Sequence, residues 1–251
     1  MTKNIFSVLG RKALVTGGRR GLGRAMAEGL LASGADVTVV SREALTEDLV
    51  NFAAASKGKL FWIGSDLSDP NQRTDLCGRA SALMGGLDIL VNNAGVQAQA
   101  PLDTYALNIF RNDYSLMVEA PFDLARQAAL LMKNGGAIVN ISSISGFQGA
   151  RNIAGYSTAK HAVVGLTKCL ANELAPKNIR VNCLAPGLFD TDMAAATIND
   201  PKKRTEMLGR IPSGRFGDPT DIVGPLIFLC SDAAKHVHGT TLLVDGGWMG
   251  R

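Results

Sequence analysis

Short apolar runs rich in β-branched residues alternate along the chain with longer segments of helical periodicity. Gly, Asp or Asn borders each run, and this punctuation is typical of buried strands. Strands are therefore predicted at residues 13–16, 37–41, 60–64, 89–92, 137–141, 180–184 and 241–244. The clearest helical patterns lie at residues 23–32, 156–174 and 219–229.

Alternating strands and helices indicate a parallel sheet that is covered by helices on both faces. Right-handed crossovers then give a Rossmann-type, doubly wound α/β fold with seven strands, whose ligands bind at the carboxyl ends of the strands. We expect a single domain over residues 1–251, because the chain is 46% hydrophobic and shows no linker or repeat. The long irregular stretch at residues 187–210 is expected to form a mobile lid or substrate loop.

Charge, cysteine content and hydropathy limit which ligands and which cellular location are expected for the protein. The 26 Lys and Arg residues are dispersed among 22 acidic residues, so the net charge of +4 suits anionic small molecules better than nucleic acid. The cysteines form no metal-binding or disulfide pattern, so we expect reduced thiols and no metal site. No apolar run reaches the roughly 18 residues of a membrane span. With no secretory pattern at the N-terminus, a cytoplasmic protein is expected.

A glycine-rich turn links the first predicted strand to the first predicted helix. Gly17, Gly21 and Gly23 are spaced so that the turn can be tight and its backbone can approach a phosphate, which the helix N-terminus also favours. We expect a dinucleotide pyrophosphate at this turn, with Arg19 and Leu22 among its contacts. An ordinary turn is the alternative.

The end of the second predicted strand bears on the choice of dinucleotide. Folds of this type that select NAD carry an acid there, but this chain has Ser41 followed by Arg42. Arg20 and Arg42 can converge on a 2′-phosphate, because guanidinium groups bind phosphate through paired hydrogen bonds. NADP(H) is therefore the preferred cofactor. NAD(H) is the alternative, in which both arginines are solvated surface residues.

Two further strand ends can hold the adenosine half of the cofactor. Asp66 and Leu67 follow the third predicted strand, where the carboxylate can accept a hydrogen bond from adenine or cap the following turn. Asn93, Ala94 and Gly95 follow the fourth strand. Small residues there let the backbone lie against the adenosine ribose, or they simply end the strand.

Ser143, Tyr156 and Lys160 form the candidate catalytic group. Hydride transfer to a carbonyl leaves an alkoxide, and a phenol whose pKa is lowered by a nearby ammonium group can protonate it. Lys160 follows Tyr156 by one helical turn, and Ser143 can hold the substrate oxygen beside the phenol. The alternative is an incidental pair on an amphipathic helix, but the chain has only three tyrosines, which argues against coincidence.

Over essentially its whole length the chain resembles the classical short-chain dehydrogenases/reductases. The matching positions are Thr16-Gly17-x-x-x-Gly21-x-Gly23, Asn92-Asn93-Ala94-Gly95, Ser143, Tyr156-Ser157-Thr158-Ala159-Lys160, Pro186-Gly187 and Thr191. The resemblance implies that Lys160 also binds the nicotinamide ribose, and that Pro186, Gly187 and Thr191 contact the nicotinamide end. It further implies a homotetramer, which agrees with apolar residues on more than one face of the predicted helices at 120–132 and 159–174.

One position departs from the family pattern. The family has a fourth catalytic residue, an Asn five residues before an aromatic, and counting back from Phe122 gives Met117. A thioether cannot make the hydrogen bonds of an amide. The proton relay is then rerouted, through Ser115 or a backbone carbonyl, or activity is reduced. The departure also supports an alternative of another class, a nucleotide-binding scaffold without turnover.

Within the family, the chain is most similar to sugar-acid dehydrogenases of the 2-dehydro-3-deoxy-gluconate 5-dehydrogenase and gluconate 5-dehydrogenase type. The similarity rests on residues 147–149, 209–217 and 245–251. It favours an oxidoreductase that interconverts a secondary alcohol and a ketone, with sugar acids among the candidate substrates. Arg20 and Arg42 indicate that the cofactor of this enzyme is NADP(H). An NAD-dependent enzyme of the first type is the alternative.

Three polar residues between Ser143 and Tyr156 are candidate substrate contacts. They are Gln148, Arg151 and Asn152. Arg151 can pair with a substrate carboxylate, or it can be a solvent-facing loop residue.

Overall fold

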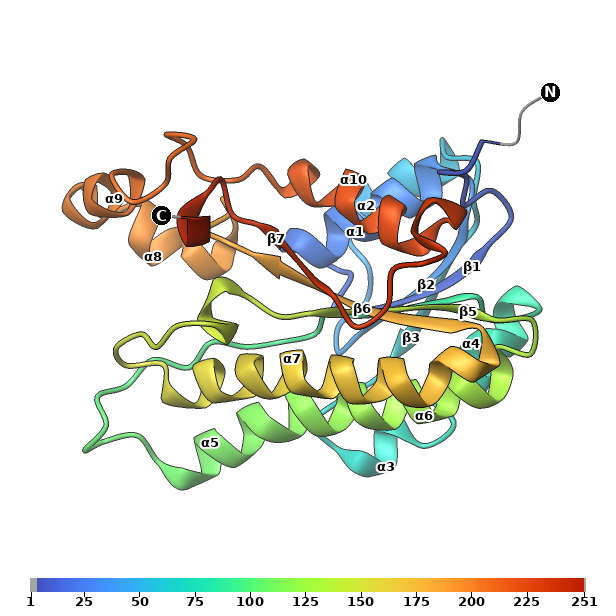
Figure 1. Cartoon of the computed structure of the whole chain (residues 1–251), viewed down its shortest axis with the longest axis horizontal. Coiled ribbons are helices and arrows are strands. Elements are labelled where there is room, and N and C mark those ends of the chain that lie inside the picture. Colours follow the sequence, from blue (N-terminus) through green and yellow to red (C-terminus); the bar gives the residue numbers. More distant parts are fainter. Residues whose placement is uncertain (1–3, 251) are drawn as a thin grey trace.

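A computed structural model of the chain, which describes residues 4–250, shows one seven-stranded sheet (Figure 1). The strands are β1 Lys12–Thr16, β2 Asp36–Ser41, β3 Leu60–Gly64, β4 Ile89–Asn92, β5 Gly136–Ile141, β6 Ile179–Pro186 and β7 Thr241–Val244. Their order is β3-β2-β1-β4-β5-β6-β7, and all neighbouring pairs are parallel. The predicted doubly wound α/β fold is confirmed. Strand order reverses between β1 and β4, where such folds bind ligands.

The central strands are covered on both faces, which explains why their sequences read as continuous apolar runs. Every residue of β4 and of β6 is buried. The predicted strand boundaries agree with the structure to within one residue, except at the end of β6. This strand continues two residues past the predicted end at Leu184, so that Pro186 belongs to the sheet.

Helices cover the sheet in two layers, one on each face (Figure 1). One layer contains α1 Gly21–Ala32, α2 Glu47–Ala54 and α10 Val223–Cys230. The other contains α4 Leu76–Met84, α6 Ala120–Leu131 and α7 Ala154–Leu174, with the short α3 Pro70–Arg73 beside it. Each layer has its own apolar core, which includes Leu30 and Leu226 in the first and Leu124 and Leu170 in the second. No helix within residues 4–250 has the length and apolar character needed to cross a bilayer.

A long helical rod runs through the second layer and changes its winding in the middle. It starts as α5 Leu107–Tyr114, continues as a π-helix at Ser115–Glu119 and ends as α6. A π-helix takes more residues per turn than an α-helix, and such segments occur frequently at functional sites. The 3.6-residue periodicity of the apolar residues does not reveal this change.

Residues 187–210 are not irregular, in contrast to the prediction. They contain a 3₁₀ turn at Asp192–Ala194, α8 Ala195–Ile198 and α9 Pro201–Leu208. These helices lie beyond the carboxyl end of β6, close to the C-terminus (Figure 1). α9 has no buried residue, so it lacks the apolar stripe that reveals other helices. Its N-terminus is fixed by Asp200, whose side chain accepts hydrogen bonds from two backbone N–H groups.

Candidate active site

The turn between β1 and α1 leaves its backbone open to a ligand. Gly17 and Gly21 have φ values of 66° and 55°, a region that favours glycine. A Cβ on Gly23 would overlap the carbonyl oxygen of Gly17. The first turn of α1 has no acidic residue, and its N-cap residue makes no side-chain cap hydrogen bond. The first N–H groups of α1 therefore point to a place that suits an anion such as a pyrophosphate.

Asn93 and Thr16 tie the end of β4 to this glycine turn. The Nδ2 atom of Asn93 donates to the carbonyl oxygens of Thr16 and Gly17, at 2.9 and 3.3 Å. The Thr16 hydroxyl accepts hydrogen bonds from the backbone N–H groups of Asn93 and Ala94, at 2.9 and 3.0 Å. The Asn93 side chain thus holds the glycine turn in place. Its backbone and that of Ala94 remain beside the turn.

The loop after β2 gathers part of the positive charge. The Arg19 guanidinium reaches this loop, where Nε donates to the Ala44 carbonyl at 2.8 Å and a terminal nitrogen lies 3.1 Å from the Glu43 carboxylate. Arg42 belongs to the same loop and is exposed. The Ser41 hydroxyl stabilises the loop by donating to the Glu43 carbonyl at 2.7 Å. The Arg19 guanidinium and Arg42 are therefore both at the loop after β2.

Arg20 points elsewhere in this structure. Its guanidinium lies 3.6 Å from the carboxylate of Asp192, in the segment that follows β6. In this structure Arg20 thus pairs with the segment after β6, whereas neighbouring Arg19 reaches the loop after β2. The Arg20 and Asp192 side chains are 72% and 77% exposed, so their ion pair is weak and Arg20 can turn away from it.

Asp66 and Leu67 form a loop at the end of β3. The Asp66 carboxylate accepts hydrogen bonds from the N–H and hydroxyl of Ser68, at 2.9 and 2.7 Å. The hydroxyl bond is the main cause that lowers the pKa of Asp66, against the opposing effect of burial. The Leu67 side chain is buried in the core, so only its backbone lies at the loop surface. The following helix, α3, is capped by Asp69 and not by Asp66.

Ser143, Tyr156 and Lys160 are buried together at the carboxyl end of β5, with exposures of 8%, 8% and 5%. The Ser143 hydroxyl accepts a hydrogen bond from the Ser145 N–H at 3.1 Å and makes a hydrogen-bonding contact with the Tyr156 hydroxyl. The Lys160 Nζ lies 5.5 Å from the centroid of the Tyr156 ring and donates to the Ile141 carbonyl at 2.7 Å. The fold thus brings together the three side chains that the sequence singled out.

Burial dominates the protonation of this group. It raises the pKa of Tyr156, and the contact with Ser143 offsets part of that effect. Burial also lowers the pKa of Lys160 to about 8. We expected Lys160 to lower the pKa of Tyr156, but in the protein alone the cost of removing a phenolate from water raises it, and the contact with Ser143 provides the opposing effect.

Met117 lies in the π-helix and is 1% exposed. It belongs to a buried apolar cluster that also contains Tyr156. The Ser115 hydroxyl is engaged elsewhere, within 3.1 Å of the Ser68 carbonyl and 2.9 Å of the Glu119 carboxylate. The structure therefore shows an apolar contact at position 117, and it places the Ser115 hydroxyl between the Ser68 carbonyl and the Glu119 carboxylate.

The residues that follow β6 close the other side of the site. Gly187 packs so tightly on the C-terminal stretch that an added Cβ would lie 2.8 Å from the Cα of Asp245. Thr191 faces the glycine turn, because a Cβ on Gly21 would lie 3.8 Å from its methyl group. Pro186, Gly187 and Thr191 thus connect the sheet edge to the glycine turn. Farther along, the Ser213 N–H donates to the carbonyl of Gly246 at 3.0 Å, on the same C-terminal stretch.

The loop between β5 and α7 carries the candidate substrate contacts. Gln148 is partly buried, whereas Arg151 and Asn152 are exposed. Asn152 has a left-handed backbone, with φ of 65°, and its carbonyl accepts a hydrogen bond from the Ala100 N–H at 2.9 Å. This bond attaches the loop to the segment after Gly95.

A hydrogen-bonded pair that packs against the start of α7 was missed by the sequence pattern: Asp113 of α5 and Tyr105, which precedes α5. Asp113 is 1% exposed, and its carboxylate accepts a hydrogen bond from the Tyr105 hydroxyl at 2.8 Å. Burial is the main cause that raises the pKa of both groups. A Cβ on Gly155 would lie 2.7 Å from the Tyr105 hydroxyl oxygen, so the pair packs directly before Tyr156. An acid and a tyrosine eight residues apart carry no recognisable sequence signal.

The cysteines are free thiols, and only Cys169 is exposed among the four. Burial raises the pKa of Cys77 and Cys230 to about 12 and that of Cys183 to about 11, so these thiols are protonated at neutral pH. Within the described part of the chain, no group of three His, Cys, Asp or Glu residues is arranged to hold a metal ion.

Known proteins share this architecture over their full length. A family model described as enoyl-(acyl carrier protein) reductase matches residues 17–249. The 2-dehydro-3-deoxy-D-gluconate 5-dehydrogenase of Pseudoalteromonas atlantica is 38% identical over 250 residues, which cover 98% of each chain. A Beutenbergia cavernae structure with NADP at low occupancy, proposed to be an NAD(P)-dependent gluconate 5-dehydrogenase, is 40% identical, with a TM-score of 0.94 over 99% of this chain and 100% of that chain.

A third comparison includes a small acid as well as the cofactor. The gluconate 5-dehydrogenase of Burkholderia cenocepacia, solved in complex with NADP and tartrate, is 32% identical to this chain. Its TM-score is 0.90, and the match covers 99% of this chain and 98% of that chain. The chain is thus similar to sugar-acid dehydrogenases, including structures that bind NADP.

Proposed function

Since the chain belongs to the short-chain dehydrogenase/reductase family and is an oxidoreductase similar to enzymes that act on CH–OH groups, we propose that it interconverts a secondary alcohol and a ketone of a sugar acid with NADP(H). One observation carries this proposal. Ser143, Tyr156 and Lys160 are buried as a single group at the sheet edge that also holds the open glycine turn. The sugar-acid class is supported by the similarity to gluconate and 2-dehydro-3-deoxy-D-gluconate dehydrogenases.

The residues at the sheet edge fit a dinucleotide. Gly17, Gly21 and Gly23 would hold the pyrophosphate with the α1 N-terminus. Other contacts would come from the strand ends and the segment after β6, at Leu22, Asp66, Leu67, Asn93, Ala94, Gly95, Pro186, Gly187 and Thr191. When bound, the dinucleotide supplies or accepts the hydride.

NADP(H) is favoured over NAD(H) by the charges around the loop after β2. That loop carries Arg42, starts from Ser41 in place of an acid and is reached by Arg19. Arg20 would join them by leaving its weak ion pair. NADP in the structures of similar proteins supports the same choice.

Tyr156 would move the proton and Ser143 would hold the substrate. In reduction, the Tyr156 hydroxyl gives its proton to the substrate oxygen, and in oxidation the phenolate takes the proton back. The Ser143 hydroxyl donates a hydrogen bond to the same oxygen and fixes it beside the phenol. The Lys160 ammonium stabilises the phenolate and would bind the nicotinamide ribose. Because Met117 offers no amide to hold a water, the proton path past Lys160 would run through water bound to backbone carbonyls such as that of Ile141, which accepts from Lys160 Nζ.

Substrate contacts would come from the loop before α7 and from residues 187–210. Gln148, Arg151 and Asn152 lie between Ser143 and Tyr156, and the exposed Arg151 is available to a carboxylate. Residues 187–210 would close over the site as a lid.

We also propose that the protein is a cytoplasmic homotetramer. Large apolar side chains are exposed along the rod formed by α5 and α6, including Leu107, Tyr114, Phe122 and Leu130. Surfaces of this kind are typical of contacts between subunits. The free thiols agree with a reducing compartment.

The proposal is tested by titrating the purified protein with NADPH and with NADH, followed by absorbance at 340 nm with a panel of ketones and keto-sugar acids. We expect tighter binding of NADPH and its oxidation by a keto-sugar acid. Preference for NADH would overturn the cofactor assignment. Tight binding without oxidation across the panel would instead favour the nucleotide-binding scaffold.

A further inference from the structure

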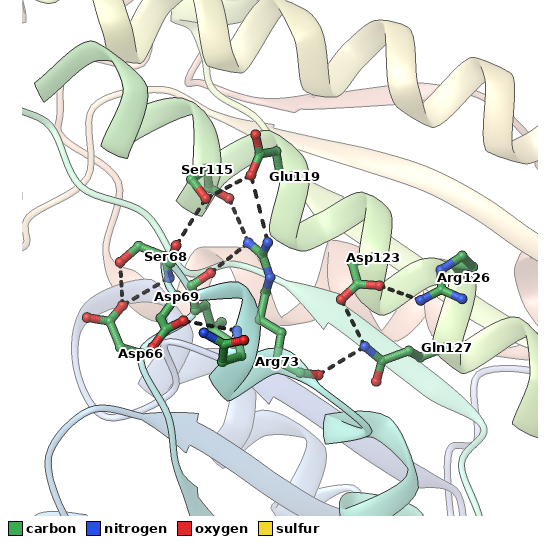
Figure 2. Close-up of polar contacts among 11 residues, drawn as sticks. Asp66, Ser68, Asp69, Arg73, Ser115, Glu119, Asp123, Arg126 and Gln127 are labelled. Carbon is green, nitrogen blue, oxygen red and sulfur yellow. Dashed lines mark hydrogen bonds and ion pairs between the residues drawn. The ribbon is translucent and has the colours of Figure 1, made fainter. Parts of the chain in front are cut away.

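Arg73 is a buried cation for which the proposed chemistry has no use. It is 4% exposed and lies at the end of α3, under the loop of residues 66–68 (Figure 2). One guanidinium nitrogen donates to the carbonyls of Leu67 and Ser115, at 2.9 and 3.2 Å, and another lies 3.7 Å from the Glu119 carboxylate. Burying a guanidinium costs free energy unless its N–H groups find partners. These three partners join two segments that are far apart in the sequence.

Ser115 makes a second link between the same segments. Its hydroxyl lies 3.1 Å from the Ser68 carbonyl and 2.9 Å from the Glu119 carboxylate, so its single hydrogen serves one of the two at a time. Figure 2 shows the Arg73 and Ser115 side chains filling the space between the loop and the π-helix. The loop of residues 66–68, which is proposed to contact the adenosine side of the cofactor, is therefore connected to the π-helix through two polar side chains.

Arg73 binds the π-helix at the carbonyl that determines its winding. The Ser115 carbonyl accepts a hydrogen bond from the N–H of Ala120, five residues later, which is the bond that defines a π turn. Arg73 donates to this same carbonyl. The guanidinium therefore shares an acceptor with the π-helix hydrogen bond between Ala120 and Ser115.

The π-helix in turn contacts both halves of the proposed site. Met117, at its centre, shares a buried apolar cluster with Ile153 and Tyr156. A Cβ added to Gly95 would lie 3.3 Å from the Met117 sulfur, so the Met117 side chain also packs under the end of β4. Because buried groups are close-packed, we expect a shift of the π-helix to displace the Tyr156 ring.

We propose that Arg73 is a positioning residue that couples occupation of the adenosine side of the cofactor site to the placement of Tyr156. A ligand that orders residues 66–68 also fixes the guanidinium, and the guanidinium fixes the π-helix under Tyr156. The functional meaning of this link rests on the proposed role of Tyr156. The link itself can be measured without turnover.

The first test is amide hydrogen exchange of residues 113–121 with and without saturating 2′,5′-ADP, a probe that carries only the adenosine side. In the wild-type protein we expect the probe to slow this exchange at least threefold. Arg73→Met should abolish the slowing at a saturating concentration of probe. The control is Arg126→Met, which removes a 62% exposed arginine paired with Asp123 on α6 and should leave the slowing intact (Figure 2). Equal slowing in the Arg73 variant, or none in the wild type, would overturn the link.

Because removal of a buried arginine can unfold a chain, Arg73→Lys is the second variant. It keeps the charge, but one ammonium group cannot span the same partners in the fixed fork of a guanidinium. We expect Arg73→Lys to lose most of the exchange coupling and to lower kcat about tenfold, while KM for NADPH changes less. A lower melting temperature with unchanged exchange and kcat would give Arg73 a purely structural role. Exchange coupling in a wild-type protein that lacks turnover would uphold the link and reject the proposed function.

Discussion

The two proposed halves of the site are a phosphate end at the glycine turn and a chemical end at Tyr156. Both lie at one edge of the sheet, but their charged groups differ in exposure to water. Arg19 and Arg20 pair with acidic side chains that are 70% and 77% exposed, so water surrounds these pairs. Tyr156 and Lys160 are at most 8% exposed and contact Ser143 or backbone. Charges in water are easily redirected, whereas buried groups have their pKa set by the protein. Substitutions at the first end should therefore alter cofactor choice, and those at the second should alter rate and pH dependence.

Tyr156→Phe should break the chemical end while sparing the phosphate end. It removes the proton-carrying hydroxyl, and because general acid–base catalysis contributes about 10²–10⁴-fold, kcat should fall on the order of 10³-fold. The dissociation constant of NADPH should change by less than about threefold, since the ring still packs. Absorbance at 340 nm and a fluorescence titration measure the two quantities. Tyr114→Phe, at a tyrosine that is 40% exposed on α5, is the control. Unchanged turnover in Tyr156→Phe would remove this residue from the mechanism.

Gly23→Ala should break the phosphate end. The added methyl group overlaps the Gly17 carbonyl, so the turn must shift away from the pyrophosphate. We expect the dissociation constants of NADPH and NADH to rise about 100-fold together, by calorimetric titration. Gly165→Ala is the control, because a Cβ at this position of α7 meets no atom within 4 Å. It should leave binding unchanged and stabilise the helix by about 1 kcal/mol. Wild-type affinity in Gly23→Ala would show that the turn does not hold the cofactor.

Arg42→Met should change the preference for NADPH over NADH at the phosphate end and leave the chemistry at Tyr156 unchanged. Loss of one charge-assisted hydrogen bond to a 2′-phosphate should reduce the preference for NADPH over NADH about tenfold. Added salt should reduce the wild-type preference for NADPH over NADH, because ions screen charges at an exposed site. Arg24→Met is a matched control, since the Arg24 guanidinium pairs with Glu28 within α1 at 2.7 Å. An equal loss of NADPH and NADH affinity in Arg42→Met would mean that Arg42 does not read the phosphate.

Lys160→Met should reveal how much the buried ammonium group lowers the free energy of unfolding. Burial lowers the pKa of Lys160 from 10.5 to about 8, so its charged form destabilises the fold fully below pH 8, and this penalty fades as the pH rises toward 10.5. Between pH 7 and pH 9 the wild type should gain about 1 kcal/mol of unfolding free energy relative to Lys160→Met. Urea unfolding at both pH values measures this gain. Lys168→Met, at an exposed lysine of α7, should show no such gain. Parallel pH profiles for the wild type and Lys160→Met would contradict the assigned pKa.

Features that depend on local pattern were predictable from the sequence. All seven strands were found, because buried parallel strands read as apolar runs between turn residues. The meeting of Tyr156 and Lys160 follows from their spacing on a helix, and the position of Ser143 follows from the end of β5. Such features need no knowledge of the distant parts of the chain.

Features that depend on contacts between distant segments were not predictable. Arg73 and Ser115 are 42 residues apart in the sequence, and no local pattern around either residue predicts the hydrogen bond between them. The direction of Arg20 depends on Asp192, which reaches it only after β6 has returned to the sheet edge. The effect of burial on the pKa of Tyr156 also follows from the assembled core. The pattern of the sequence therefore locates the chemical groups, while packing determines their orientation and their protonation.

The attachment of residues 187–210 at both ends has a consequence for how substrate range can change. Gly187 at the start of this segment and Ser213 just beyond its end both rest on the C-terminal stretch around Asp245 and Gly246. The helices between them therefore form a segment whose two ends are both anchored to the C-terminal stretch. We expect that such a segment can be exchanged for one of another length or sequence while Ser143 and Tyr156 keep their places. If this segment covers the substrate as proposed, evolution or protein engineering can replace it and keep the proposed hydride-transfer residues.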